Sequence, residues 1–171
     1  GPGRGGRPGV VRGEGETPGA EGRRVFSAVD GSDDGDAAAR WALAHRGLFG
    51  PRPKFELIHV ARDLPFQSRT LLANLADMSF TQDSVRALRR QEYERAVRSV
   101  LPLFVGAGIA VRQVDLSGEA GEQLAAYSQR RLDVLVMGSH GQGLFKAAVL
   151  GSVATRVAAR CTTPLLLIRK A

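Results

Sequence analysis

Three glycines and a serine in the second half of the chain have the types and the spacing of a phosphate-binding turn. Gly138 and Gly141 are separated by two residues, and nine residues then lead to Gly151 and Ser152. Glycine permits left-handed turns and a close approach of the backbone to a ligand. A helix start presents free N–H groups and a partial positive charge, and a serine hydroxyl adds another donor. These residues predict that the segment from Leu132 to Ser152 holds an anionic ligand such as a polyphosphate.

The placement of this turn strengthens the prediction, because glycines that serve only tight turns can have the same spacing. The run Leu132–Met137 is almost entirely apolar, which is typical of a central parallel strand buried on both faces. A helical pattern over Val149–Arg160 overlaps the end of the turn. The sequence has no Walker-type pattern, and no dinucleotide-binding Gly-x-Gly-x-x-Gly follows a strand, so a Walker-class NTPase is not expected.

The elements that must position this turn alternate between strands and helices along the chain. The expected strands are Val25–Val29, Phe55–Val60, Ile109–Leu116, Leu132–Met137 and Pro164–Ile168. The expected helices are Asp34–Arg46, Gln82–Val105 with a kink at Pro102, Glu119–Arg130 and Val149–Arg160. Such alternation predicts an α/β fold with an open parallel sheet of five strands and helices on both faces. Ligands of such sheets bind beyond the carboxyl ends of the strands.

Two of these elements carry more detailed expectations. The first helix places Ala37, Trp41, Ala44 and Leu48 at helical spacing, so we expect this side to face the core. The segment Ile109–Leu116 alternates apolar and polar residues, which predicts a strand with one exposed face at an edge of the sheet.

Several polar residues near the predicted strand ends are open to two interpretations. Asp30 follows the first strand and either contacts the ligand or caps the next helix. Asp33, Asp34 and Asp36 are acids that a helix N-terminus favours without any metal, so no metal site is expected there. His140 lies inside the predicted turn and either contacts a phosphate as a cation or faces solvent.

The composition fits one globular domain preceded by a tail. The chain has 171 residues, of which 43% are hydrophobic and 24% charged. We expect residues 1–23, rich in Gly and Arg, to form a disordered tail and residues 24–171 to form the folded domain. No apolar stretch reaches the roughly 18 residues of a transmembrane helix, and Cys161 is the only cysteine, which fits a reducing compartment. The expected location is therefore the cytoplasm.

The net charge of +7 at pH 7 raises the question of an anionic macromolecular partner. Basic residues such as Arg86, Arg90 and Arg98 share a predicted helix with the acids Glu92 and Glu94, which is typical of a solvated helix face. The tail is short, contains acids and lacks aromatic residues. We therefore expect no nucleic-acid partner and no membrane contact.

Four segments together resemble a known family. Val29-Asp30-Gly31-Ser32, Val136-Met137-Gly138-Ser139-His140-Gly141, Leu150-Gly151-Ser152-Val153 and the closing segment Thr163 to Arg169 are similar to the corresponding segments of universal stress proteins. The resemblance extends over about Arg24 to Lys170. It is specific in the C-terminal half of the chain.

This resemblance implies a strand order of 3-2-1-4-5 and ATP as the bound nucleotide. Carried over by position, it implies that the phosphates and ribose are held by Gly138, Gly141, Gly151, Ser152 and Val153. It further implies that Asp30 meets the ribose or adenine side and that Ala28 and Val60 line the adenine pocket, and we count Met137 with the nucleotide-binding residues. It also implies a homodimer paired through the last strand, Pro164 to Arg169.

We therefore expect an ATP-binding universal stress protein with a regulatory role in the stress response. Mg²⁺ can accompany the triphosphate, although no acidic residue in the turn points to it. Hydrolysis is expected to be weak at most, because Asp30 and His140 are the only candidates for a group at the terminal phosphate. Two alternatives remain open: a non-nucleotide interaction module of the same fold, and a slow ATPase.

Overall fold

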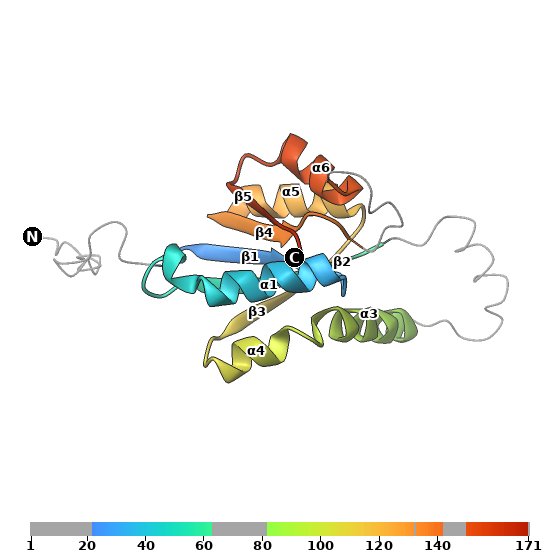
Figure 1. Ribbon diagram of the computed structural model, residues 1–171. Coiled ribbons are helices and arrows are strands. Elements are labelled where there is room, and N and C mark those ends of the chain that lie inside the picture. Colours follow the sequence, from blue (N-terminus) through green and yellow to red (C-terminus); the bar gives the residue numbers. More distant parts are fainter. Residues whose placement is uncertain (1–21, 63–81, 132, 142–149, 171) are drawn as a thin grey trace, which may run out of the picture.

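The computed structural model describes residues 22–62, 82–131, 133–141 and 150–170 of the chain (Figure 1). The predicted tail, apart from Gly22 and Arg23, and residues 142–149 of the predicted turn lie outside the described residues. The strands are β1 (Arg24–Ala28), β2 (Lys54–Ala61), β3 (Val111–Ser117), β4 (Val134–Gly138) and β5 (Leu165–Ile168). The helices are α1 (Asp33–Ala44), the 3₁₀ helix η1 (Arg46–Phe49), α3 (Gln82–Val97), α4 (Leu101–Gly106), α5 (Ala120–Arg131) and α6 (Ser152–Arg160).

The five strands form one sheet in the order β3-β2-β1-β4-β5, and every neighbouring pair is parallel. This confirms the predicted sheet and the strand order that the resemblance implied. The chain builds outward from β1 to β3 and then returns to the other side of β1 with β4. The strand order therefore reverses between β1 and β4, where open α/β sheets bind their ligands.

Helices cover both faces of the sheet, as predicted, and each face has its own core. On one face α1, α3 and α4 pack against strand residues such as Val25, Phe55 and Val136. On the other face α5 and α6 pack against residues such as Phe26, Ile58 and Leu135. The central strands β1, β2 and β4 contribute buried residues to both cores, because successive side chains of a strand point to opposite faces.

The prediction of which side of α1 faces the core is wrong. The buried residues are Ala38, Ala39 and Ala42, whereas Trp41 is only half-buried and Leu48 is 69% exposed in η1. The small alanine side chains let α1 lie close to the sheet, and this close packing decides the face more strongly than the hydrophobicity of the larger residues.

The predicted long helix Gln82–Val105 is two helices, α3 and α4, separated by Arg98–Val100. Pro102 lies in the first turn of α4, where its missing N–H leaves no hydrogen bond unmade. The interruption keeps Val97, Val100 and Phe104 buried against the sheet.

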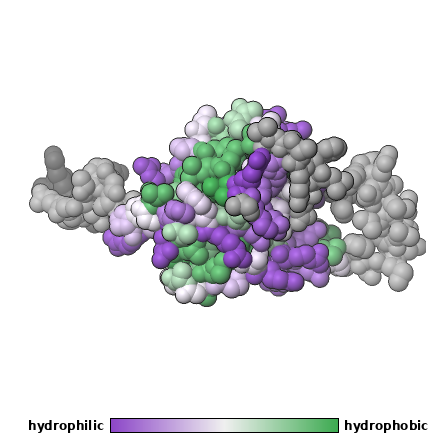
Figure 2. All heavy atoms as spheres, in the orientation of Figure 1, coloured by the Kyte–Doolittle hydropathy of each residue, from purple (hydrophilic) through white to green (hydrophobic). Residues whose placement is uncertain are grey.

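The two outer strands differ in their surroundings. β3 is an edge strand, as predicted, and its residues are half-buried or exposed. β5 is the other edge, and all four of its residues are half-buried and apolar. Figure 2 shows a hydrophobic patch over β5 beside the more hydrophilic surface of α1.

Candidate functional site

A cavity lies at the carboxyl ends of β1, β2 and β4, where the strand order reverses. Its lining includes seven of the nine residues that the sequence predicted for the site, so the fold gathers residues that are up to 125 positions apart. These seven are Ala28, Asp30, Val60, Met137, Gly138, Gly141 and Val153.

The inner wall of the cavity is apolar. Val60 and Met137 come from strand ends, Leu124 from α5 and Val153 from α6, and all four belong to the core between the sheet and these helices. An apolar wall of this kind suits a flat, weakly polar ring system such as a nucleobase. Leu124 was not predicted for the site, although the apolar face of its predicted helix was the signal that could have found it.

The mouth of the cavity carries the turn after β1. The Asp30 carboxylate accepts hydrogen bonds from the main-chain N–H of Ser32, at 2.9 Å, and from the Ser32 hydroxyl. Ser32 is the N-cap of α1, and its hydroxyl oxygen accepts from the Gly35 N–H at 3.2 Å. Asp30 was expected either to cap the first helix or to contact the ligand. Ser32, not Asp30, is the cap of α1. Asp30 is exposed, and it lines the cavity.

Asp34 connects three segments beside the cavity. Its Oδ2 accepts from the Ser139 hydroxyl at 3.0 Å and from the His140 main-chain N–H at 3.2 Å. Its Oδ1 accepts from the main-chain N–H of Lys170, just after β5, at 3.1 Å. One carboxylate thus joins the start of α1, the start of the glycine turn and the end of the last strand.

The same contacts set the charge state of Asp34. Partial burial by itself would raise the pKa of the Asp34 carboxyl, but the hydrogen bonds from Lys170, Ser139 and His140 outweigh it, and the pKa lies below its ordinary value. No local pattern in the sequence points to this role of Asp34, because its partners lie more than 100 residues further along the chain.

His140 is not a solvent-facing loop residue, one of the two alternatives that the sequence left open. Its side chain is 13% exposed and lines the cavity, and its Nδ1 lies 3.3 Å from Asp34 Oδ2. Together with Asp30 it is one of two titratable side chains among the described residues that line the cavity.

The glycines of the predicted motif differ in what surrounds them. A Cβ at Gly138 would lie 2.6 Å from the Asp34 carbonyl carbon, and one at Gly151 would lie 3.1 Å from the Ser139 carbonyl oxygen. Both positions are therefore constrained by backbone packing. Among the described residues, a Cβ at Gly141 would meet only the end of the Asp30 side chain, at 2.9 Å. Gly141 is thus the motif glycine that borders the cavity and is not constrained by the backbone of the described residues.

The last two predicted residues, Gly151 and Ser152, do not line the cavity but begin α6 beside it. Gly151 is the N-cap of α6 and has no capping side chain among the described residues, and its N–H donates to the Ser139 carbonyl at 2.7 Å. Ser152 is exposed in the first turn. The first N–H groups of a helix have no partner within it, so this end of α6 presents donors beside Val153 and Ala154, which line the cavity.

Within the described ranges, no group of three or more His, Cys, Asp or Glu side chains is arranged to hold a metal ion. None of the described helices is long and apolar enough to cross a membrane.

Comparison with known proteins places this geometry in a family. The sequence model described as "Universal stress protein family" matches residues 22–169. A universal stress protein from Methanocaldococcus jannaschii is 20% identical over 156 residues, which are 86% of this chain and 95% of that protein. A structure of the M. jannaschii protein aligns with a TM-score of 0.64 at 19% identity, covering 87% of this chain and 96% of that one.

Two further solved structures are reported with adenine nucleotides. One is a universal stress protein in complex with cAMP, 21% identical, with a TM-score of 0.53, covering 88% of this chain and 99% of that one. The other is a universal stress protein family member from Arabidopsis thaliana with AMP bound, 17% identical, with a TM-score of 0.52, covering 87% of this chain and 92% of that one. At these identities the structural likeness establishes the shared fold.

Proposed function

Because the chain belongs to the universal stress protein family, we propose that it binds an adenine nucleotide, with ATP as the expected form, and acts as a regulatory protein of the stress response. The proposed site is the cavity at the carboxyl ends of β1, β2 and β4. The observation that carries the proposal is the gathering of seven predicted residues around this one cavity. The AMP and cAMP found on two structural relatives support the same class of ligand.

The chemistry of the lining residues suggests which of them would contact the adenine ring, the ribose and the phosphates. The apolar side chains of Val60, Leu124 and Met137 would receive the adenine ring by excluding water from it. The Asp30 carboxylate, at the mouth, would accept hydrogen bonds from ribose hydroxyls. The start of α6, which has no side-chain cap among the described residues, would stabilise phosphate groups through its N–H donors and its partial positive charge.

A slow ATPase is the second candidate, and the pairing of His140 with Asp34 favours it. A histidine that lines the cavity and lies 3.3 Å from a carboxylate has the geometry of an oriented general base. Mg²⁺ would arrive with the triphosphate, since the described residues offer no three-ligand metal site of their own. Phosphate release by the wild type and by His140→Asn measures this candidate directly, and equal rates would exclude His140.

We also propose that two copies pair through the segment Pro164 to Arg169. The supporting observation is that β5 is an edge strand, the kind that can pair with another chain, and that its four residues are apolar and half-buried. Sedimentation equilibrium at micromolar concentration is expected to give a dimer. A monomer would contradict this proposal and leave the nucleotide site unaffected. The cytoplasm remains the proposed location.

The nucleotide proposal is tested by looking for nucleotide that copurifies with the full chain. The protein is purified without added nucleotide and denatured, and the released small molecules are identified by mass spectrometry. We expect ATP, ADP or AMP in the extract, or an upward shift of the unfolding temperature when ATP is added to ligand-free protein. Neither nucleotide in the extract nor a shift at millimolar ATP would instead favour an interaction module of the same fold.

A further inference from the structure

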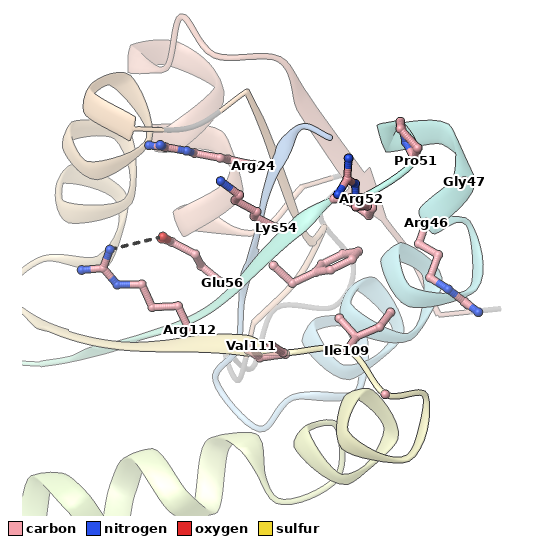
Figure 3. Close-up of a pocket in the computed structure, with 15 residues that line it drawn as sticks. Arg24, Arg46, Gly47, Pro51, Arg52, Lys54, Glu56, Ile109, Val111 and Arg112 are labelled. Carbon is pink, nitrogen blue, oxygen red and sulfur yellow. Dashed lines mark ion pairs between the residues drawn. The ribbon is translucent and has the colours of Figure 1, made fainter. Parts of the chain in front are cut away.

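A second hollow lies at the opposite end of the sheet and has a different chemical character. It is an open groove of about 1260 Å³ along the amino-terminal ends of β1, β2 and β3 (Figure 3). Small-molecule sites usually measure about 300–1,000 Å³, so a groove of this size suits an extended ligand. Five of its fifteen lining residues are cationic, and one is acidic. The cations are Arg24, Arg46, Arg52, Lys54 and Arg112.

The strand register brings part of this charge onto one face of the sheet. Arg24 is paired with Lys54, and Glu56 with Arg112, across neighbouring strands. Paired residues of neighbouring strands have their side chains on the same face. Figure 3 shows the ends of Arg24, Lys54 and Arg112 directed to the same side, whereas Arg46 points the other way.

The acidic residue of the groove is already engaged by the protein. Glu56 has a side chain that is only 10% exposed, and its carboxylate accepts from the Tyr127 hydroxyl at 2.7 Å. Its other oxygen lies 3.7 Å from an Arg112 guanidinium nitrogen. Arg46 donates to the Leu43 carbonyl at 2.9 Å. Arg52 and Lys54 are exposed, and no ion pair to either is found within the described ranges.

We propose that this groove binds the phosphodiester backbone of double-stranded nucleic acid without regard to sequence. Guanidinium groups match phosphate oxygens in a two-pronged geometry, and clustered positive charge is the feature that distinguishes nucleic-acid surfaces from protein–protein interfaces. The one aromatic residue among those lining the groove, Phe55, is buried. Unstacked bases of a single strand would therefore find no ring to stack on, which favours a duplex.

This proposal reverses our expectation that the chain has no nucleic-acid partner. That expectation rested on helices in which acids accompany the basic residues. The cations of the groove come from β1, from the segment between α1 and β2, from the first residue of β2, and from β3, and only the folded sheet brings them together. Residues 1–21 carry three arginines and three glutamates, so the net charge of +7 belongs to the rest of the chain.

The test measures binding of the full chain to a fluorescent 20-base-pair DNA duplex by anisotropy at several salt concentrations. With about three to four phosphate contacts, the affinity should fall on the order of 10²-fold between about 50 and 200 mM salt. The variant Arg52→Glu/Lys54→Glu should bind at least about tenfold more weakly than the wild type at low salt. The matched control Arg90→Glu/Arg98→Glu changes the net charge equally on exposed positions of α3 and the turn after it. It should stay within about threefold of the wild type.

Each other outcome would overturn the proposal. Absence of duplex binding at low salt, or equal weakening in both double variants, would mean that the groove is not a nucleic-acid site. Tighter binding of the single strand than of the duplex would contradict the choice of a duplex. Tighter binding of a polyglutamate peptide, with the same sensitivity to Arg52→Glu/Lys54→Glu, would identify an acidic protein segment as the partner.

Discussion

The two ends of the sheet carry the two proposed anion-binding sites, and the linings of these sites are opposite in character. At the carboxyl ends, the cavity is lined by apolar side chains and backbone, and its two titratable residues are held by specific contacts with Ser32 and Asp34. At the amino ends, the groove presents several cations, and Arg52 and Lys54 are exposed. The first arrangement can select one ligand by shape and hydrogen bonding. The second attracts many anions through charge alone, and its affinity depends on salt.

This contrast teaches that net charge is a poor guide to where a small anion binds. The proposed nucleotide site has no lysine or arginine among its described lining residues and relies on the start of α6 for positive potential. The groove has the cations but lacks an enclosed pocket of apolar side chains. Variants at the two ends should therefore have separate effects, because the two sets of lining residues have no member in common.

The largest effect on ATP affinity is expected from a glycine-to-valine substitution, which can be made at both ends of the sheet. Gly141→Val should weaken ATP binding by about 100-fold or more, because a side chain there would occupy the cavity, and no backbone atom of the described residues lies against a Cβ at this position. Gly47→Val is the control in the groove, since no atom of the described residues lies within 4 Å of a Cβ at Gly47. Calorimetric titration with ATP measures both. An unchanged affinity in folded Gly141→Val would move the nucleotide site elsewhere.

The next largest effect is on stability, and it should differ between two neighbouring carboxylates of α1. Asp34→Asn should lower the free energy of unfolding by about 1–3 kcal/mol and also weaken ATP binding, because it deprives Ser139 and His140 of a charged acceptor. Asp33→Asn removes only the exposed ion pair with Lys170 Nζ and should change stability by less than about 1 kcal/mol. Urea unfolding gives both values. Equal losses in the two variants would contradict the bridging role of Asp34.

A smaller effect is expected in the dependence of stability on pH. Asp34 and Glu119 both have a pKa below the ordinary value, since hydrogen bonds to their carboxylates outweigh the effect of burial. The folded state therefore binds fewer protons than the unfolded state in acid, and stability should fall as the pH drops below about 5. The arginines and the lysine of the groove keep their charge in this range.

The pH dependence is measured by urea unfolding of the wild type and of Asp34→Asn between pH 7 and pH 3. The variant should lose less stability on acidification than the wild type, because it lacks the Asp34 carboxyl, whose pKa is lowered in the folded state. Parallel pH curves for the two proteins would show that Asp34 does not contribute in this way.

The smallest effect concerns the start of α6. Ser152→Ala should weaken ATP binding about threefold, a loss of roughly 0.7 kcal/mol, if the hydroxyl donates to a phosphate. Thr155→Ala is the control one turn further on, because the Thr155 hydroxyl donates to the Gly151 carbonyl at 2.9 Å. A larger loss in Thr155→Ala than in Ser152→Ala would assign the effect to the helix rather than to a ligand contact.

The features that sequence could predict are those encoded by local patterns. Apolar runs and glycine turns predicted the five parallel strands, and the resemblance supplied their order, so Ala28, Val60 and Met137 fell at the correct strand ends. The face of α1 was wrong because Ala38 and Ala42 are buried through tight packing, which hydrophobicity does not reveal.

The features that could not be predicted from the sequence depend on contacts between segments that are far apart along the chain. Asp34 meets Ser139, 105 residues later, and the groove joins Arg24 to Lys54 and Arg112 through strand pairing. Local spacing in the sequence does not predict these contacts, because they depend on which strands become neighbours and in which register they pair.

The central claim, that the nucleotide occupies the carboxyl-end cavity and not the basic groove, is tested most directly by mapping ATP onto the backbone of the full chain. Amide ¹H–¹⁵N spectra of assigned protein are recorded during an ATP titration at about 150 mM salt, which screens exposed charges. The account predicts saturable shifts at Asp30, Gly141 and Val153, with Arg52 and Lys54 unchanged. Shifts confined to Arg52 and Lys54, or no saturable shift at either end of the sheet, would contradict it.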